Sequence, residues 1–126
     1  MTAEFNLNQF KEVFVSESKE NLSALNADLL QLEKTPEDAN LLNDIFRVLH
    51  TLKGMSATMG FEKLTELAHE MENVLDLLRK GQAKPGVDII AVLFDCFDCL
   101  ETLVDEISAG QEKGIDVKNL TGKLKN

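Results

Sequence analysis

The sequence predicts an all-α protein folded as an up-down antiparallel four-helix bundle. Apolar residues recur at steps of three and four in four segments, and short turns that contain Pro or Gly separate these segments. No stretch of residues 1–109 shows the alternating pattern of a strand. The 126 residues, 44% of them hydrophobic, suffice for one domain with its own core. We expect this helical domain to cover residues 1–109, followed by a linker or short C-terminal helix over residues 110–126.

The first predicted helix covers about residues 6–33. Steps of three and four residues place its apolar side chains in one stripe, with Ser18 bridging the one wider gap. The stripe consists of Leu7, Phe10, Phe14, Leu22, Leu25, Leu29 and Leu32. Such a stripe predicts that one face of the helix is buried against the rest of the bundle.

The second predicted helix begins around Thr35 and ends at about Met59. Thr35 suits the N-cap position, Pro36 suits the first helical position, and the two acidic residues that follow suit the positive end of the helix dipole. Gly60 predicts the end of the helix, because glycine readily adopts the left-handed conformation found there. The predicted buried row is Leu42, Ile45, Leu49, Leu52 and Met59.

The third predicted helix follows at once and ends at Gly81, and the fourth covers about residues 87–109. The predicted buried side chains of the third helix are Leu64, Leu67, Met71, Val74 or Leu75, and Leu78. The fourth is largely apolar apart from a polar stripe at Asp88, Asp95, Asp98, Thr102 and Asp105. After Gly110 the chain becomes polar and contains further glycines, so it either forms a short fifth helix capped by Asp116 or frays.

Charge and hydropathy exclude several classes of function. A net charge of −9 argues against binding to nucleic acid or to anionic membrane surfaces, because both need clustered Lys and Arg. The longest apolar run, residues 89–94, is far shorter than the roughly 20 residues of a membrane-spanning helix. The N-terminus lacks the basic start and apolar stretch of a signal peptide, so we expect a cytoplasmic protein.

Cys96 and Cys99 form the only cysteine pair in the chain. There is no second pair, and the surrounding segment is apolar and helical, so the spacing is weak evidence for a zinc or redox site. We interpret both residues as small apolar side chains one turn apart on a buried face.

His50 is placed at the flank of the buried row of the second helix, with Gly54 one turn later. Because helical side chains lean toward the N-terminus, a side chain at position 54 would lie over His50. Glycine therefore leaves the imidazole uncovered. Lys53 brings an ammonium group to the same face. This pattern indicates a reactive histidine.

The hairpin of the second and third helices predicts which polar side chains meet. His50 and Glu72 lie equally far from residue 61 at the turn, as do Lys53 and His69. We therefore expect His50 to face Glu72 and Lys53 to face His69, with the two third-helix residues on one face. A carboxylate at Nδ1 would leave the Nε2 lone pair free as a nucleophile, and a lysine could balance phosphoryl oxygens.

The window from Ile45 to Phe61 contains no Asp or Glu, although it includes Arg47 and Lys53. In an acidic chain, this gap indicates a docking face around the histidine for a partner that brings its own negative charge. Arg47 is the candidate docking residue.

The stretches HTLKGMSATMGF and AHEMENVLDLLRKG closely resemble the histidine phosphotransfer (HPt) domain. The resemblance is specifically to the N-terminal phosphotransfer domain of CheA-type chemotaxis histidine kinases. It implies that His50 is phosphorylated at Nε2, that the phosphoryl group comes from ATP on a separate kinase domain, and that it passes to an aspartate in the receiver domain of a response regulator.

The family motif carries over to four further positions. Lys53 and Gly54 match its lysine and glycine, while His69 and Glu72 match its supporting network, with Glu72 as the partner of the His50 imidazole. The resemblance implies the phosphoacceptor domain of a kinase in two-component chemotaxis signalling, with ATP and Mg²⁺ bound by the partner domains and no cofactor or metal bound here.

The chain contains no phosphate-binding loop motif for ATP, so it would be either a piece of a longer kinase or a free-standing phosphocarrier. The HPt domain of a hybrid sensor kinase is a further alternative, because such domains use a similar motif. We expect the isolated domain to be a monomer.

Two alternatives come from other classes of protein. Glu66 and His69 have the E-x-x-H spacing of di-iron bundles, but there is no second copy, and Arg47 stands where a ligand near His50 would be needed. The other alternative is an adaptor bundle whose histidines only satisfy structural hydrogen bonds.

Overall fold

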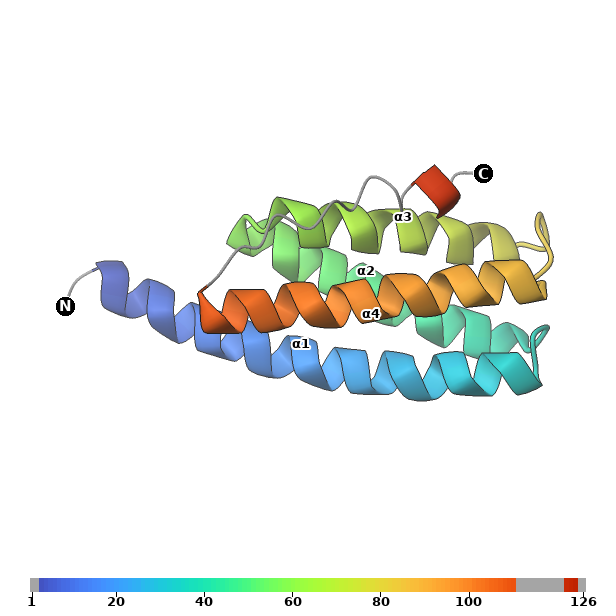
Figure 1. Ribbon diagram of the computed structural model, residues 1–126, viewed down its shortest axis with the longest axis horizontal. Helices are drawn as coiled ribbons and strands as arrows, with labels where there is room; N and C mark the ends of the chain where they lie inside the picture. The colour runs from blue at the N-terminus through green and yellow to red at the C-terminus, as the bar shows by residue number, and fades with distance from the viewer. Residues whose placement is uncertain (1–2, 111–121, 125–126) are drawn as a thin grey trace.

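The computed structural model describes residues 3–110 and 122–124 and, for residues 3–8, the backbone only. Within this part of the chain it contains no strand, four long helices and a short helical turn at residues 122–124. The long helices are α1 Ala3–Lys34, α2 Ala39–Met59, α3 Glu62–Arg79 and α4 Val87–Ala109. Successive helices run antiparallel to one another and are joined by short turns (Figure 1). The predicted up-down four-helix bundle is confirmed, and the domain boundary at residue 109 stays a prediction.

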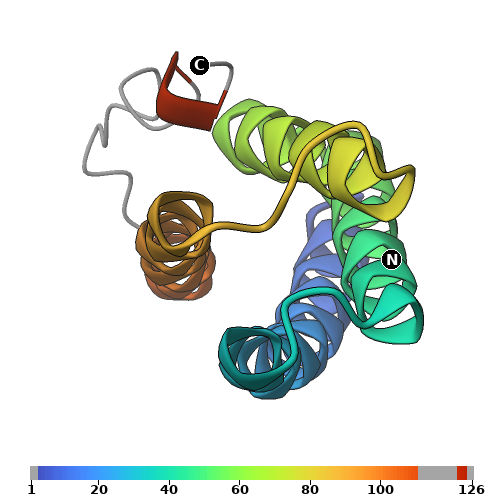
Figure 2. The same cartoon turned by 90° about the vertical axis from the view of Figure 1, so that its right-hand side faces the viewer.

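Each helix packs against two others, so the bundle closes in the order α1, α2, α3, α4 (Figure 2). All four helices contribute fully buried side chains to one core. The largest are Leu25, Leu29, Leu32, Ile45, Leu49, Leu52, Leu64, Leu67, Met71, Leu75, Leu93 and Leu100. The predicted inward rows of α2 and α3 are therefore confirmed, except that Met59 is only half-buried.

The predicted stripe of α1 is buried from Phe14 onward but not before it. Phe14 contacts Phe61 with ring centroids 5.1 Å apart, whereas Phe10 is 61% exposed. The prediction that Phe10 is buried is wrong because the first turns of α1 extend past the end of the bundle, where no helix faces them (Figure 1). The side chain of Leu7 lies outside the described residues.

The start of α2 differs from the prediction. Asp38, not Thr35, is the N-cap, and its carboxylate accepts hydrogen bonds from the backbone N–H groups of Asn40 (3.1 Å) and Leu41 (3.2 Å). Residues 35–38 instead form a turn closed by the Asp38 N–H donating to the Thr35 carbonyl at 3.1 Å. Pro36 fits the second position of that turn as well as it fits a first helical position, because both need the same φ.

The α2–α3 turn has the predicted form. Gly60 has φ +78°, and Phe61 N–H donates to the Ser56 carbonyl at 3.0 Å, which closes the end of α2 tightly. Gly110 ends α4 in the same left-handed conformation, while α3 ends at Arg79, shortly before the predicted Gly81. The short turn at Gly60 sets the register between α2 and α3.

Of the two cysteines of α4, Cys96 is buried as expected, whereas Cys99 is only half-buried. Burial raises the pKa of Cys96 to about 12 and also raises that of Cys99, so both thiols stay protonated, and neither forms a disulfide. The stripe residues Asp88, Asp95, Asp98, Thr102 and Asp105 are all exposed. None of the described helices is long and apolar enough to cross a membrane.

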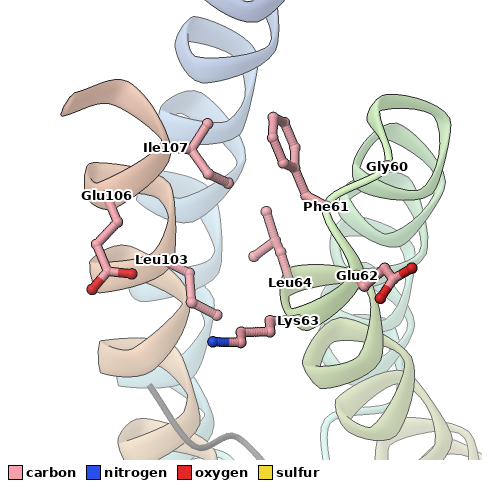
Figure 3. A pocket seen from close by; sticks show the side chains of 8 residues that line it. All are labelled: Gly60, Phe61, Glu62, Lys63, Leu64, Leu103, Glu106 and Ile107. Carbon is pink, nitrogen blue, oxygen red and sulfur yellow. The ribbon is translucent and has the colours of Figure 1, made fainter. Parts of the chain in front are cut away.

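A hollow of about 190 Å³ lies where the start of α3 faces the end of α4 (Figure 3). Its apolar lining comes mainly from Phe61, Leu64, Leu103 and Ile107. Glu106 also lines it and is buried, which the sequence pattern did not predict.

Near the C-terminus, residues 122–124 are helical, and Leu124 packs against the core. The predicted cap Asp116 lies outside the described residues.

Replacing either of two buried serines by alanine should change the stability of the fold, in opposite directions. Ser18 Oγ is fully buried without a hydrogen-bond partner among the described residues, whereas Ser56 Oγ donates to the Lys53 carbonyl (3.0 Å) and lies 3.0 Å from Thr65 Oγ1. We expect Ser18→Ala to raise the free energy of unfolding by about 1 kcal/mol and Ser56→Ala to lower it by about as much. Urea unfolding measures both, and a shift of the same sign in the two variants would contradict this account.

Candidate functional site

His50 and Glu72 meet across the α2–α3 hairpin, as their equal distance from the turn predicts. His50 Nδ1 lies 2.9 Å from Glu72 Oε2. The histidine side chain is 63% exposed, while that of Glu72 is only 10% exposed. The imidazole therefore stands at the surface with one nitrogen held by a buried carboxylate, and its Nε2 has no partner among the described residues.

Glu72 receives a second hydrogen bond on its other oxygen. Lys53 Nζ donates to Glu72 Oε1 at 2.9 Å. Burial by itself raises the pKa of Glu72, but the hydrogen bonds and charges of Lys53 and His50 outweigh it, so the pKa lies below its ordinary value of 4.5. Glu72 is therefore ionised at neutral pH and can only accept. Nδ1 must then donate, and the Nε2 lone pair is left free in the neutral imidazole.

The predicted pairing of Lys53 with His69 is wrong. The long lysine side chain reaches the level of His50 and binds Glu72, because an ionised carboxylate attracts the ammonium more strongly than an imidazole does. His69 is exposed and lines a separate open hollow with Ala57 and Thr65. The structure thus brings together His50, Lys53 and Glu72 but not His69.

Gly54 lies one turn after His50 on exposed helix surface. A Cβ at this position would meet no heavy atom within 4 Å, the imidazole included. Packing within the domain therefore does not require glycine here. The space beside His50 is open, and any requirement for glycine comes from longer side chains or from what approaches the histidine.

Gly54→Ala should raise the free energy of unfolding by about 1 kcal/mol, because glycine in a helix interior costs about that much relative to alanine. The added methyl group has free space, so no clash offsets this gain. Chemical denaturation of the two proteins measures the difference. A destabilised variant would show that the glycine relieves strain that the geometry does not reveal.

Arg47 is exposed on α2 beside the site. It lies on the acid-free stretch of α2 together with His50 and Lys53. Since Lys53 is paired with Glu72, Arg47 is the exposed positive charge of this stretch that is unpaired among the described residues, on a strongly acidic chain. Such a surface suits a negatively charged partner.

Two residues next to His50 escaped prediction. The rings of Phe46 and His50 are nearly parallel. The guanidinium of Arg79 lies over the Phe46 ring, 3.8 Å from its centroid. Helical spacing could have found Phe46, which lies one turn before the histidine. The hairpin register could have found Arg79, which lies level with Asn43, about one turn from Phe46.

The metal-enzyme alternative has no support in the structure. In the part of the chain that the structure describes, no group of three or more His, Cys, Asp and Glu side chains could hold a metal ion. Glu66 and His69 are both exposed, whereas a di-iron site needs ligands that point into the bundle core. An exposed imidazole held by a buried carboxylate is instead the arrangement of an activated nitrogen nucleophile.

Comparisons with known proteins agree with this geometry. A family model of the Hpt domain matches residues 9–110. The chemotaxis protein CheA of Bacillus subtilis is 48% identical over 118 residues, which are 94% of this chain and 18% of that protein. The chain thus spans less than a fifth of the length of the curated relatives it matches.

Two solved structures resemble the whole bundle. The CheA phosphotransferase domain from Thermotoga maritima is 46% identical with a TM-score of 0.76, covering 79% of this chain and 95% of that one. The solution structure of a histidine phosphotransfer domain of CheA is 40% identical with a TM-score of 0.84, covering 99% of this chain and 92% of that one. The chain therefore belongs to the Hpt domain family, and within it to the phosphotransfer domains of CheA proteins.

Proposed function

We propose that His50 Nε2 accepts a phosphoryl group from ATP bound on the kinase domain of a CheA-type chemotaxis kinase and passes it to an aspartate of a response regulator. The observation that carries this proposal is the exposed imidazole whose Nδ1 meets the buried, ionised Glu72 at 2.9 Å. This contact selects the nucleophilic nitrogen and leaves it facing outward.

In the first transfer, the Nε2 lone pair attacks the γ-phosphorus of ATP. The N–P bond forms as the bond from that phosphorus to the bridging oxygen breaks, and ADP leaves with the bonding electrons. The imidazole then carries positive charge, because both of its nitrogens are substituted or protonated. Glu72 stabilises this charge through the Nδ1–H hydrogen bond, and its second oxygen stays neutralised by Lys53.

In the second transfer, a carboxylate oxygen of the receiver aspartate attacks the same phosphorus. The N–P bond breaks, and its electrons return to Nε2, which restores the neutral imidazole. The phosphorylated ring is a good leaving group because it is cationic. The same property makes a phosphohistidine labile in acid and stable in alkali.

Lys53 has a supporting role in this proposal. Its side chain is 22% exposed and its ammonium is already bound to Glu72, so the ammonium is held close to the site where phosphoryl oxygens arrive. Its positive charge reduces the repulsion between the Glu72 carboxylate and the incoming phosphoryl group. Among the described residues, no hydrogen bond or ion pair joins His69 to this trio, so any supporting role for it must be indirect.

We place ATP and Mg²⁺ on the partner domains. Both oxygens of Glu72 are occupied by donors, so the site offers no free carboxylate as a metal ligand.

The acid-free stretch of α2, which contains Arg47, is the proposed docking surface for the kinase domain and the receiver domain in the cytoplasm. The phosphorylated P1 domain of CheA3 from R. sphaeroides, in complex with CheY6, has the same fold at 24% identity and a TM-score of 0.82.

The domain itself is proposed to act only as the phosphoryl acceptor and donor, as a monomer. The hybrid-kinase and free-standing carrier alternatives predict the same chemistry with other partners.

The test is incubation of the chain with a CheA-type kinase core, Mg²⁺ and labelled ATP, followed by addition of a receiver domain. We expect one acid-labile, alkali-stable label per chain, which the receiver domain then removes. Label that survives acid, or label that the receiver cannot discharge, would contradict the proposal.

A further inference from the structure

The Phe46 ring lies against the imidazole of His50. The two rings are inclined by only 10°, and their centroids are 6.1 Å apart, which is an offset stack. Phe46 is half-buried one helical turn before His50. Glu72 holds the imidazole through Nδ1, but a single hydrogen bond allows the ring to tilt about it. A parallel ring beside the imidazole restricts that tilt.

Arg79 holds Phe46 from the end of α3. Its guanidinium carbon lies 3.8 Å from the Phe46 ring centroid, within the range of a cation–π contact. Arg79 is itself fixed by two polar contacts: Nε donates to Asp76 Oδ1 at 2.8 Å, and a terminal nitrogen lies 3.5 Å from Asn43 Oδ1. Hydrogen bonds from Lys80 and Arg79 lower the pKa of Asp76, so this anchor is ionised at neutral pH.

We propose that Arg79 is a positioning residue for His50 and acts on it through Phe46. Glu72 sets which nitrogen of His50 is free, and the Arg79–Phe46 stack sets the plane of the ring. Together they fix the orientation in which Nε2 is presented on the exposed surface of α2, where Gly54, one turn later, leaves free space. The attacking lone pair is then presented in one direction before a partner docks.

The kinetic part of this proposal rests on the proposed phosphotransfer, but the structural part does not. Which ring nitrogen of His50 is protonated, and how uniformly, can be read from ¹⁵N NMR of the isolated domain without any partner. We compare Arg79→Ala and Phe46→Leu with Lys80→Ala. Lys80 is the matched control, because it neighbours Arg79, has the same charge and also binds Asp76 (2.8 Å), but it is not among the contacts of Phe46.

Because a ring that tilts out of plane weakens the Nδ1–H hydrogen bond to Glu72, we expect the Nδ1–H signature of His50 to weaken in Arg79→Ala and Phe46→Leu and to stay unchanged in Lys80→Ala. The kcat for phosphorylation by the kinase core should fall about two- to five-fold in the first two variants with KM unchanged, the size expected from losing an exposed cation–π contact. Arg79→Lys, which keeps the charge but not the planar group, should recover part of the loss. Circular dichroism verifies that each variant is folded.

Several outcomes would overturn the proposal. One is unchanged His50 spectra together with unchanged kcat in Arg79→Ala. Another is a rise in KM alone, which would make Arg79 a docking residue. A third is equal effects of Arg79→Ala and Lys80→Ala, which would reduce the effect to net charge. If the wild-type domain is not phosphorylated at all, the proposed function fails, while the spectra still decide whether Arg79 and Phe46 position the ring.

Discussion

His50→Gln is expected to abolish phosphorylation by the kinase core completely. A glutamine amide has no basic lone pair on nitrogen, so no N–P bond can form at this position. The fold should survive, because His50 is 63% exposed and contributes one hydrogen bond at the surface. We expect the free energy of unfolding to change by less than about 1 kcal/mol, as for most exposed substitutions. Labelled ATP and a urea melt of the same preparation measure both quantities.

His69→Gln is the matched control, because it changes the only other histidine in the chain. His69 is exposed, and the Glu72 carboxylate is bound by His50 and Lys53 instead, so we expect the His69 variant to be labelled to the same final extent as the wild type. Labelling of His50→Gln, or loss of labelling in His69→Gln alone, would make His69 the acceptor and refute the assignment.

The helices were predictable because a bundle of this size leaves a strong period in the sequence. The bounds of α4 and the left-handed glycine after α2 follow from local signals. The start of α2 does not, because Thr35 and Asp38 are both good caps and Pro36 suits a turn as well as a helix. Only the hydrogen bonds distinguish these possibilities.

The contacts of the site were predictable where the backbone register determines which residues meet. They were not predictable where a flexible side chain can choose between partners. The tight turn at Gly60 fixes the register that brings His50 to Glu72. The same register places Lys53 level with His69, but four methylene groups let its ammonium reach the stronger partner. The contact of Arg79 with Phe46 was missed for a related reason. Phe46 carries no charge, so the sequence offers no pair of opposite charges that would indicate this contact.

Glu72→Gln should slow phosphorylation about 10- to 100-fold, the size of loss usual when a carboxylate that orients a metal-binding histidine is removed. Glutamine keeps the shape but loses the charge that holds the Nδ1 proton and stabilises the phosphorylated ring. The same change leaves the partly buried Lys53 without its anion, so we expect the free energy of unfolding at pH 7 to fall by about 1–3 kcal/mol. Glu66→Gln, an exposed carboxylate on the same helix, is the control for charge alone.

The pH dependence of that stability difference tests the cause. The pKa of Glu72 is lowered in the folded protein, so its contribution is fully present above the ordinary carboxyl value of 4.5 and is lost as the pH falls through the lower folded value. The wild type and Glu72→Gln should therefore converge in stability only in acid below that value. A difference that persists unchanged there would mean that Glu72 stabilises the hairpin by packing. The ion pair with Lys53 and the hydrogen bond with His50 would then no longer explain why this carboxylate is buried beside an exposed imidazole.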